Sequence, residues 1–146
     1  MTQSWDRIYT PHRLEYLRGA VTSDGCPFCA APELNGSDAL DLVAHRGQLA
    51  YVVLNLYPYN AGHLLICPYR HVADYTDLTD AERDEISRLT QESMHTLRAI
   101  SGAQGFNLGM NQGSISGAGI AAHLHQHVVP RWGGDANFMP IIGETK

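Results

Sequence analysis

The alternation of apolar and polar residues along this 146-residue chain predicts five short strands and one long helix. The strand segments are rich in Val, Leu, Ile and Tyr, and they are bounded by Gly, Pro or Asn. They are residues 40–45, 49–55, 63–68, 106–110 and 122–130, with a turn at Arg46 and Gly47 between the first two.

Residues 74–102 are expected to contain the one clear helix. Thr79 followed by Glu82 is a capping-box pattern, and Gly102 is a typical residue at the end of a helix. A mainly apolar stripe with helical spacing lies between them, and its members are Ile86, Leu89, Ser93, Leu97 and Ile100.

This order of elements predicts one α+β domain over residues 1–146, with an antiparallel sheet. The strands follow one another through short turns or the single helix, whereas a parallel doubly wound sheet needs a long crossover between strands. Residues 1–25 contain Trp5, Ile8 and Leu14, so we expect this N-terminal arm to be packed.

Charge and composition narrow the function classes. The formal net charge is −5 and the chain has no basic run, so duplex nucleic acid is not an expected partner, whereas this charge does not exclude a small phosphorylated substrate. No apolar stretch reaches membrane-spanning length, and the first seven residues lack a signal-peptide core. We therefore expect a cytoplasmic protein without a membrane partner.

Cys26 and Cys29 form a C-P-F-C motif that has three interpretations. Two thiolates at this spacing are a common half-site for structural zinc, with His71 and His123 as candidates for the other two ligands. A redox pair fits less well, because no strand-then-helix pattern surrounds the motif. The third interpretation is two unrelated buried cysteines, and Cys67, in an apolar run, is expected to be a small core residue.

The most informative motif is H-L-H-Q-H-V-V, residues 123–129. Alternate side chains of an extended strand share a face, so His123, His125 and His127 are expected to point to one side, about 7 Å apart in succession. Such a row suits metal ligation or nucleophilic catalysis, and the alternative is a row that only faces solvent.

Residues 113–119, just before the histidines, are rich in Gly and Ser. Small residues let backbone amides approach a phosphate, although the same composition also fits a flexible hairpin loop. An imidazole can attack phosphorus and form a covalent intermediate. The row of histidines and this loop together therefore favour nucleotidyl transfer.

The histidine motif resembles the signature of the histidine-triad (HIT) family. A second block, N-L-Y-P-Y-N-A-G-H-L-L-I-C-P-Y-R-H over residues 55–71, resembles the nucleoside-binding segment of that family. The closing V-V-P-R-W-G-G-D-A-N-F-M-P and the opening Y-T-P-H-R resemble the bacterial branch that includes diadenosine tetraphosphate phosphorylases. The likeness covers roughly residues 26–140.

This resemblance implies a five-stranded antiparallel meander with flanking helices, which forms a homodimer or a larger homo-oligomer. It implies that His125 is the nucleophile, that His127 assists the leaving oxygen, and that His63 lies near the α-phosphate or orients the nucleophile. It also implies substrate-binding residues, namely Asn55 for the ribose, Asn111 and the backbone of Gly117, Ala118 and Gly119 for phosphate oxygens, and Trp132 for base stacking or for packing.

In zinc-bearing members of the family, two cysteines and two histidines bind the metal. The resemblance therefore implies a structural zinc site that holds the N-terminal region against the catalytic strand without touching substrate. Its ligands would be Cys26, Cys29, His71 and His123.

The sequence departs from the family pattern at two places. Gln126 stands where members have an apolar residue, so the opposite face of its strand is expected to be less buried or to meet another subunit. Gly119 and Ile120 stand where many members carry Gln and Ser or Thr. Backbone donors are expected to replace those side chains, which argues against phosphoramidate hydrolysis.

The favoured function is cleavage of dinucleoside polyphosphates, with inorganic phosphate as the acceptor of the nucleotidyl group. Hydrolysis of the same substrates, and phosphoramidase activity or transfer to a sugar phosphate, are alternative activities. A non-catalytic nucleotide-binding or interaction protein is a third alternative. A hydrolase that uses the three histidines as metal ligands is a fourth.

Overall fold

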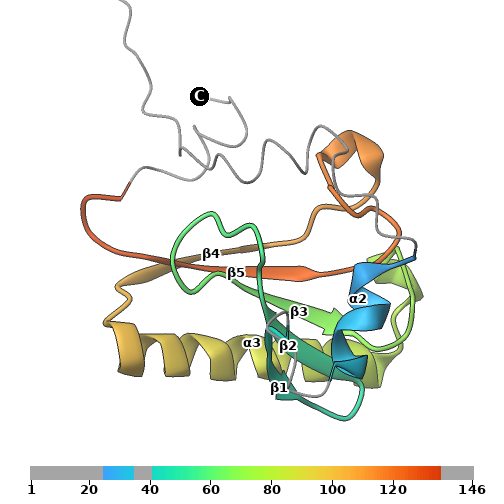
Figure 1. Ribbon diagram of the computed structural model, residues 1–146, viewed down its shortest axis with the longest axis horizontal. Helices are drawn as coiled ribbons and strands as arrows, with labels where there is room; N and C mark the ends of the chain where they lie inside the picture. Colours follow the sequence, from blue (N-terminus) through green and yellow to red (C-terminus); the bar gives the residue numbers. More distant parts are fainter. Residues whose placement is uncertain (1–24, 35–40, 136–146) are drawn as a thin grey trace, which may run out of the picture.

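Five strands form one antiparallel sheet in the computed structural model, which describes residues 25–34 and 41–135 (Figure 1). The strands are β1 (Val43–Arg46), β2 (Ala50–Leu54), β3 (Leu64–Pro68), β4 (Gly105–Gly109) and β5 (Gln126–Arg131). The predicted antiparallel α+β class is confirmed. The predicted packed arm over residues 1–25 lies outside the described residues except for Gly25, and so does residue 40 of the first predicted strand.

The order of the strands is β1-β2-β3-β5-β4, so the predicted meander is wrong in one respect. The long helix α3 (Asp80–Ser101) carries the chain from β3 to β4, and β5 then pairs antiparallel with both. This arrangement places β5, which carries His127, inside the sheet rather than at its edge.

The helix α3 lies within the predicted residues and begins where the capping-box pattern indicates. Thr79 is its N-cap, the capping box with Glu82 is present, and Gly102 ends the helix with φ of 64°. Residues from Asp74 do not extend α3, because the Asp74 carboxylate accepts a hydrogen bond from the Thr76 amide and starts the separate 3₁₀ turn η2 (Tyr75–Asp77). The other short helices are α2 (Pro27–Ala30), η1 (Ala31–Glu33) and η3 (Ser114–Ser116).

Each face of the sheet has its own hydrophobic cluster, because alternate strand residues point to opposite sides. Ala50, Val52, Leu64, Ile66 and Val128 pack against Ile86, Leu89 and Leu97 of α3. Ile100 is the exception in the predicted stripe, since it is 74% exposed. Within the described residues, no helix is both long and apolar enough to cross a bilayer.

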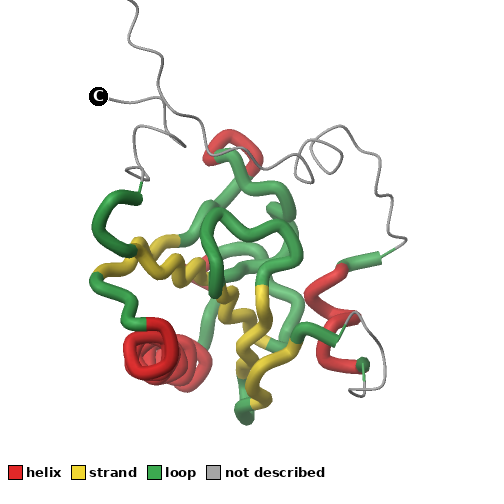
Figure 2. The backbone as a smooth tube through the Cα atoms, turned by 60° about the vertical axis from the view of Figure 1, so that its left-hand side comes forward, coloured by secondary structure: helices red, strands yellow, loops and turns green. Residues whose placement is uncertain are grey.

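The opposite face carries the short helix α2. Phe28 packs with Tyr51, Val53, Leu65 and Cys67 of β2 and β3. Figure 2 shows α2 and α3 on opposite sides of the strands. Cys67 is fully buried, as predicted, and burial raises the pKa of its thiol.

The last strand begins at Gln126, not at residue 122 as predicted. Before that point the Leu124 amide donates to the Val72 carbonyl at 2.7 Å, so the chain leaves the sheet ladder. The expectation that all three histidines lie on one strand is therefore wrong, since only His127 lies within β5.

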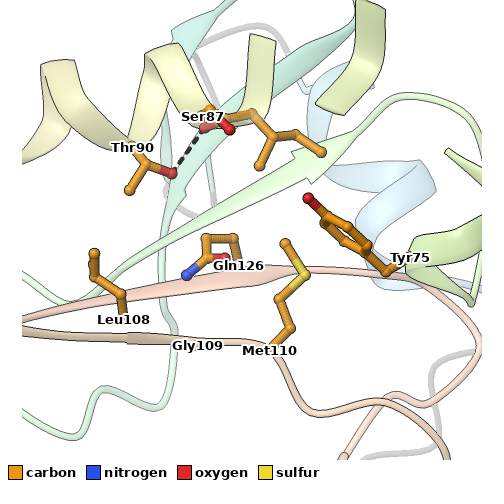
Figure 3. Close-up of a pocket in the computed structure, with 8 residues that line it drawn as sticks. Tyr75, Ser87, Thr90, Leu108, Gly109, Met110 and Gln126 are labelled. Atoms are coloured by element: carbon orange, nitrogen blue, oxygen red, sulfur yellow. Dashed lines mark hydrogen bonds between the residues drawn. The ribbon is translucent and has the colours of Figure 1, made fainter. Parts of the chain in front are cut away.

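Gln126 lies on the α3 face of β5 and is half-buried. It lines a groove of about 250 Å³ between α3 and the β4 edge, together with Tyr75, Thr90 and Met110 (Figure 3). Leu108 on that edge strand is 47% exposed. The homodimer implied by the resemblance stays a prediction.

Two carboxylates of α3 tie the helix to the sheet. Glu85 accepts hydrogen bonds from the amides of Gln48, Leu49 and Ala50 in the β1–β2 turn. Glu82 accepts two from the Arg70 guanidinium, at 2.9 and 2.7 Å, besides its role in the capping box. These bonds place the end of β3, and the residues after it, against the start of α3.

The Glu82 carboxylate predicts a specific loss of stability in acid. The Arg70 hydrogen bonds, with those from Thr79, hold the pKa of Glu82 at about 2 in the folded protein, below its ordinary value of 4.5. Its contribution is therefore complete above about pH 4.5 and is lost as the pH falls toward 2. Glu82→Gln should lower the free energy of unfolding by about 1–2 kcal/mol at pH 7, and by less as the pH approaches 3.

Denaturant unfolding of the metal-free protein between pH 3 and 7 measures this difference. Glu92→Gln is the matched control, since Glu92 pairs with Arg88 on the exposed face of the same helix. That variant should lose about 0.5 kcal/mol or less. An equal and pH-independent loss in both variants would contradict the assignment.

Candidate active site and metal centre

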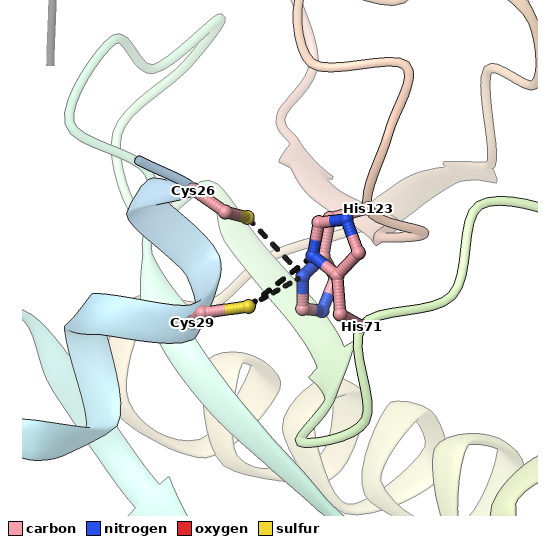
Figure 4. Close-up of side chains that lie close together, drawn as sticks. All are labelled: Cys26, Cys29, His71 and His123. Atoms are coloured by element: carbon pink, nitrogen blue, oxygen red, sulfur yellow. Dashed lines mark hydrogen bonds between the residues drawn. The ribbon is translucent and has the colours of Figure 1, made fainter. Parts of the chain in front are cut away.

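The two sequence motifs that contain cysteine and histidine meet at one place. The Sγ atoms of Cys26 and Cys29 and one ring nitrogen each of His71 and His123 all lie within 4.8 Å of one another (Figure 4). Cys26 is the N-cap of α2 and Cys29 lies within that helix, whereas His71 comes from the segment after β3 and His123 from the segment before β5. The structure therefore assembles the four residues that the sequence predicts as metal ligands.

His123 is oriented for ligation by a backbone group. Its ring is fully buried, and Nε2 lies 2.9 Å from the carbonyl oxygen of Pro68. A carbonyl only accepts, so Nε2 carries the proton and the lone pair of the neutral ring is on Nδ1. That Nδ1 lies 3.3 Å from the Sγ of Cys26 and 3.5 Å from that of Cys29. Two soft sulfurs and two imidazoles are the donor set that zinc prefers.

The tautomer of His125 is fixed by the preceding histidine. The Nδ1 of His125 lies 2.8 Å from the carbonyl oxygen of His123, so Nδ1 donates and the lone pair is on Nε2. Burial lowers the pKa of His125, which keeps the ring neutral at pH 7. Its Nε2 is therefore a base.

His127 has the opposite tautomer. The backbone amide of Tyr59 donates to Nδ1 of His63 at 3.0 Å, so the proton of the neutral His63 ring is on Nε2. This Nε2 lies 2.9 Å from Nδ1 of His127 and donates to it, which leaves the proton of neutral His127 on Nε2. The rings of His125 and His127 are 5.0 Å apart, so a base and a proton donor lie side by side.

Asn55 lies close to these histidines, but its side chain already has internal contacts. Its amide nitrogen lies 3.2 Å from Nδ1 of His63, and its oxygen accepts from the Tyr57 amide at 3.0 Å. The structure thus gives Asn55 a part in orienting His63, and its ribose contact stays a prediction.

The predicted phosphate loop has a defined backbone shape. Gly113, with φ of 74° and ψ of 157°, adopts a conformation that is essentially limited to glycine. The Gly117 amide donates to the Ser114 carbonyl within η3, so the amides of Ala118 and Gly119 are the better candidates for a phosphate oxygen. Asn111 lies at the start of this loop, directly after β4 and Met110.

Trp132 is not brought together with the catalytic histidines. It follows β5, five residues beyond His127, which corresponds to about 17 Å of extended strand. Its indole N–H donates to the Ser101 carbonyl at the end of α3. This contact gives Trp132 a packing role, one of the two that its sequence position suggested.

Two aromatic residues of the site were missed at the sequence level. The Phe28 ring lies 4.8 Å from the ring of His125, and the Tyr59 ring lies 5.0 Å from that of His63. The position of Phe28 between the two cysteines was a usable signal, because a metal site that includes both cysteines and His123 places Phe28 close to the histidine motif. Nothing in the spacing of Tyr59 marked it.

A comparison with known families agrees with this geometry. The HIT domain model matches residues 40–134, which is well over half of the chain. The chain belongs to the HIT family.

Among sequence relatives of this HIT protein is an AP-4-A phosphorylase of Mycobacterium tuberculosis. It is 48% identical over 148 aligned positions, which cover 96% of this chain and 75% of the relative.

Solved HIT structures share the fold. A Zn-bound histidine-triad protein from Mycobacterium smegmatis superposes with a TM-score of 0.68 at 28% identity, covering 78% of this chain and 81% of that one. A HIT family protein from Bacillus anthracis has the same TM-score at 27% identity, covering 80% of each chain.

Proposed function

We propose that this HIT protein is a diadenosine tetraphosphate phosphorylase that works through a nucleotidyl-histidine intermediate. The observation that carries the proposal is the pair of opposite tautomers at His125 and His127. The 48% identity to the mycobacterial AP-4-A phosphorylase supports this substrate and supports phosphate, rather than water, as the acceptor.

In the first half of the reaction, Nε2 of His125 attacks the α-phosphorus of the substrate. The bond from phosphorus to the bridging oxygen breaks, and ATP leaves. The Nε2–H of His127 donates its proton to the leaving oxygen, and the Nε2–H of His63 holds His127 in the donor tautomer. Adenylate is then bound covalently to His125.

In the second half, an oxygen of inorganic phosphate attacks the same phosphorus, and the bond to His125 breaks. Nε2 of His127 takes the proton that this phosphate oxygen loses, so both histidines return to their starting states and ADP leaves. With water as the acceptor the product would be AMP, which is the hydrolase alternative.

The remaining predicted residues have binding roles in this proposal. Asn111 and the backbone amides of Ala118 and Gly119 bind phosphate oxygens, with a smaller part for Gly117 because its amide is already used. Backbone donors of this kind stabilise charge that develops on phosphate oxygens. Asn55 contacts the ribose while it also orients His63.

We also propose that the cluster of Cys26, Cys29, His71 and His123 holds a structural zinc ion. The donor set and the orientation of His123 support this assignment, as does the similarity to the Zn-bound relative. Zinc at this place would cross-link α2 to the segment before β5. This structural role differs from that of a catalytic metal held by His123, His125 and His127. In this chain those histidines point to different partners.

Product analysis tests the proposed reaction. Diadenosine tetraphosphate with inorganic phosphate should yield ADP and ATP, and omission of phosphate should stop turnover. His125→Ala should lower kcat by at least about 10³-fold, because the nucleophile is removed. His95→Ala, on the exposed face of α3, is the control and should keep full activity. Formation of AMP irrespective of phosphate would contradict the phosphorylase assignment.

Metal analysis tests the proposed zinc site. The purified protein should contain about one zinc per chain, and Cys29→Ser should lose most of it. The loss should lower Tm by more than about 5 °C, since metal binding contributes directly to folding. Cys67→Ala removes the buried cysteine outside the cluster and should retain zinc. Full zinc content in Cys29→Ser would contradict the site.

A further inference from the structure

Tyr59 lies against both histidines of the proton-donating pair. Its side chain is buried in the loop between β2 and β3. Its ring is stacked on that of His63, with centroids 5.0 Å apart and planes inclined by 19°. The same ring lies 6.0 Å from that of His127.

The backbone of Tyr59 acts on the same pair. Its amide donates to Nδ1 of His63, which places the proton of His63 on Nε2, the nitrogen that faces His127. The amide thus fixes the direction of the hydrogen-bonded chain, while the ring covers one face of His63 and limits its rotation. Tyr59 therefore constrains both the tautomer of His63, through its amide, and the plane of the His63 ring, through its side chain.

The loop that carries Tyr59 is anchored on the end of β5. Asn60 donates to the Asp135 carboxylate at 2.7 Å and to the Pro130 carbonyl at 3.1 Å. Asp135 in turn accepts from the Trp132 amide at 3.0 Å. The P-R-W-G-G-D segment, residues 130–135, thereby holds Asn60, the residue next to Tyr59. The proposed chemistry gives this segment no other role.

We propose that Tyr59 is a positioning residue for the His63–His127 pair, and that the Asn60–Asp135 contact holds it in place. The proposal rests on the function proposed above, in which His127 protonates the leaving oxygen. Without the ring, His63 and His127 can rotate away from the orientation in which Nε2–H of His127 meets that oxygen. A small displacement of a reacting group costs up to about 100-fold in rate.

The dependence of rate on the leaving group separates this role from a general structural one. A leaving group that is already a good anion needs little protonation, whereas a basic one needs the acid. The probes are the phenyl and 4-nitrophenyl esters of AMP, since 4-nitrophenol is much more acidic than phenol. In each case His125 displaces the phenol, and inorganic phosphate then releases ADP.

The experiment compares single-turnover release of each phenol by the wild-type protein, Tyr59→Leu and Tyr59→Phe. Tyr59→Leu should slow the phenyl ester by about 10- to 100-fold and the 4-nitrophenyl ester by less than about threefold. Tyr59→Phe keeps the ring and should stay within about threefold of wild type on both esters. His127→Asn is the reference for complete loss of the acid and should show the same selectivity, more strongly.

Equal losses on the two esters in Tyr59→Leu, or no loss on either, would overturn the proposal. A selective loss in Tyr59→Phe would overturn the assignment to the ring. If Tyr59→Leu does not fold, Asn60→Ala decides, with a smaller loss confined to the phenyl ester as the supporting result. Failure of the wild-type protein to cleave either ester or diadenosine tetraphosphate would instead overturn the proposed function itself.

Discussion

The chemistry of this site depends on two backbone carbonyls, which orient the rings of His123 and His125. The Pro68 carbonyl holds the His123 ring so that Nδ1 faces two cysteines, and the His123 carbonyl holds Nδ1–H of His125. His123 therefore contributes its side chain to the metal cluster, while its main-chain carbonyl orients the reacting histidine, His125. A change in the cluster that moved His123 would also move the group that determines which nitrogen of His125 is basic.

A second backbone group determines the opposite tautomer on the neighbouring histidine. The Tyr59 amide donates to Nδ1 of His63, and Nε2 of His63 donates in turn to Nδ1 of His127, which leaves the proton of His127 on Nε2. His125 is a base and His127 is a proton donor although both are imidazoles. The reason is that a carbonyl accepts from His125, whereas an amide, acting through His63, determines the proton position of His127. These assignments rest on main-chain groups, namely the Tyr59 amide and the His123 carbonyl.

Much of this arrangement could be predicted from the sequence, because it follows from the types of residue and their spacing along the chain. The capping box at Thr79 marked the start of α3, and the C-P-F-C motif with His71 and His123 marked the metal cluster. The order of the strands could not be predicted, since nothing local shows that β4 lies one strand away from β3 and that β5 fills the place between them. Local hydrogen bonds also override the strand pattern, as at Leu124, and the irregular shape of the loop before β3 brings Tyr59 onto His63, four residues further along the chain.

The central claim is that His125 becomes covalently adenylated while His127 serves as the acid. Acid quenching of the protein would destroy a phosphoramidate bond, so the reaction with diadenosine tetraphosphate is stopped under alkaline denaturing conditions, without inorganic phosphate. Mass spectrometry of peptides then locates the adenylate. The account predicts one adenylate per site, on His125, which disappears with release of ADP when phosphate is added before the quench. An adenylate on His127 or His63, or ATP release with no covalent adduct, would contradict it.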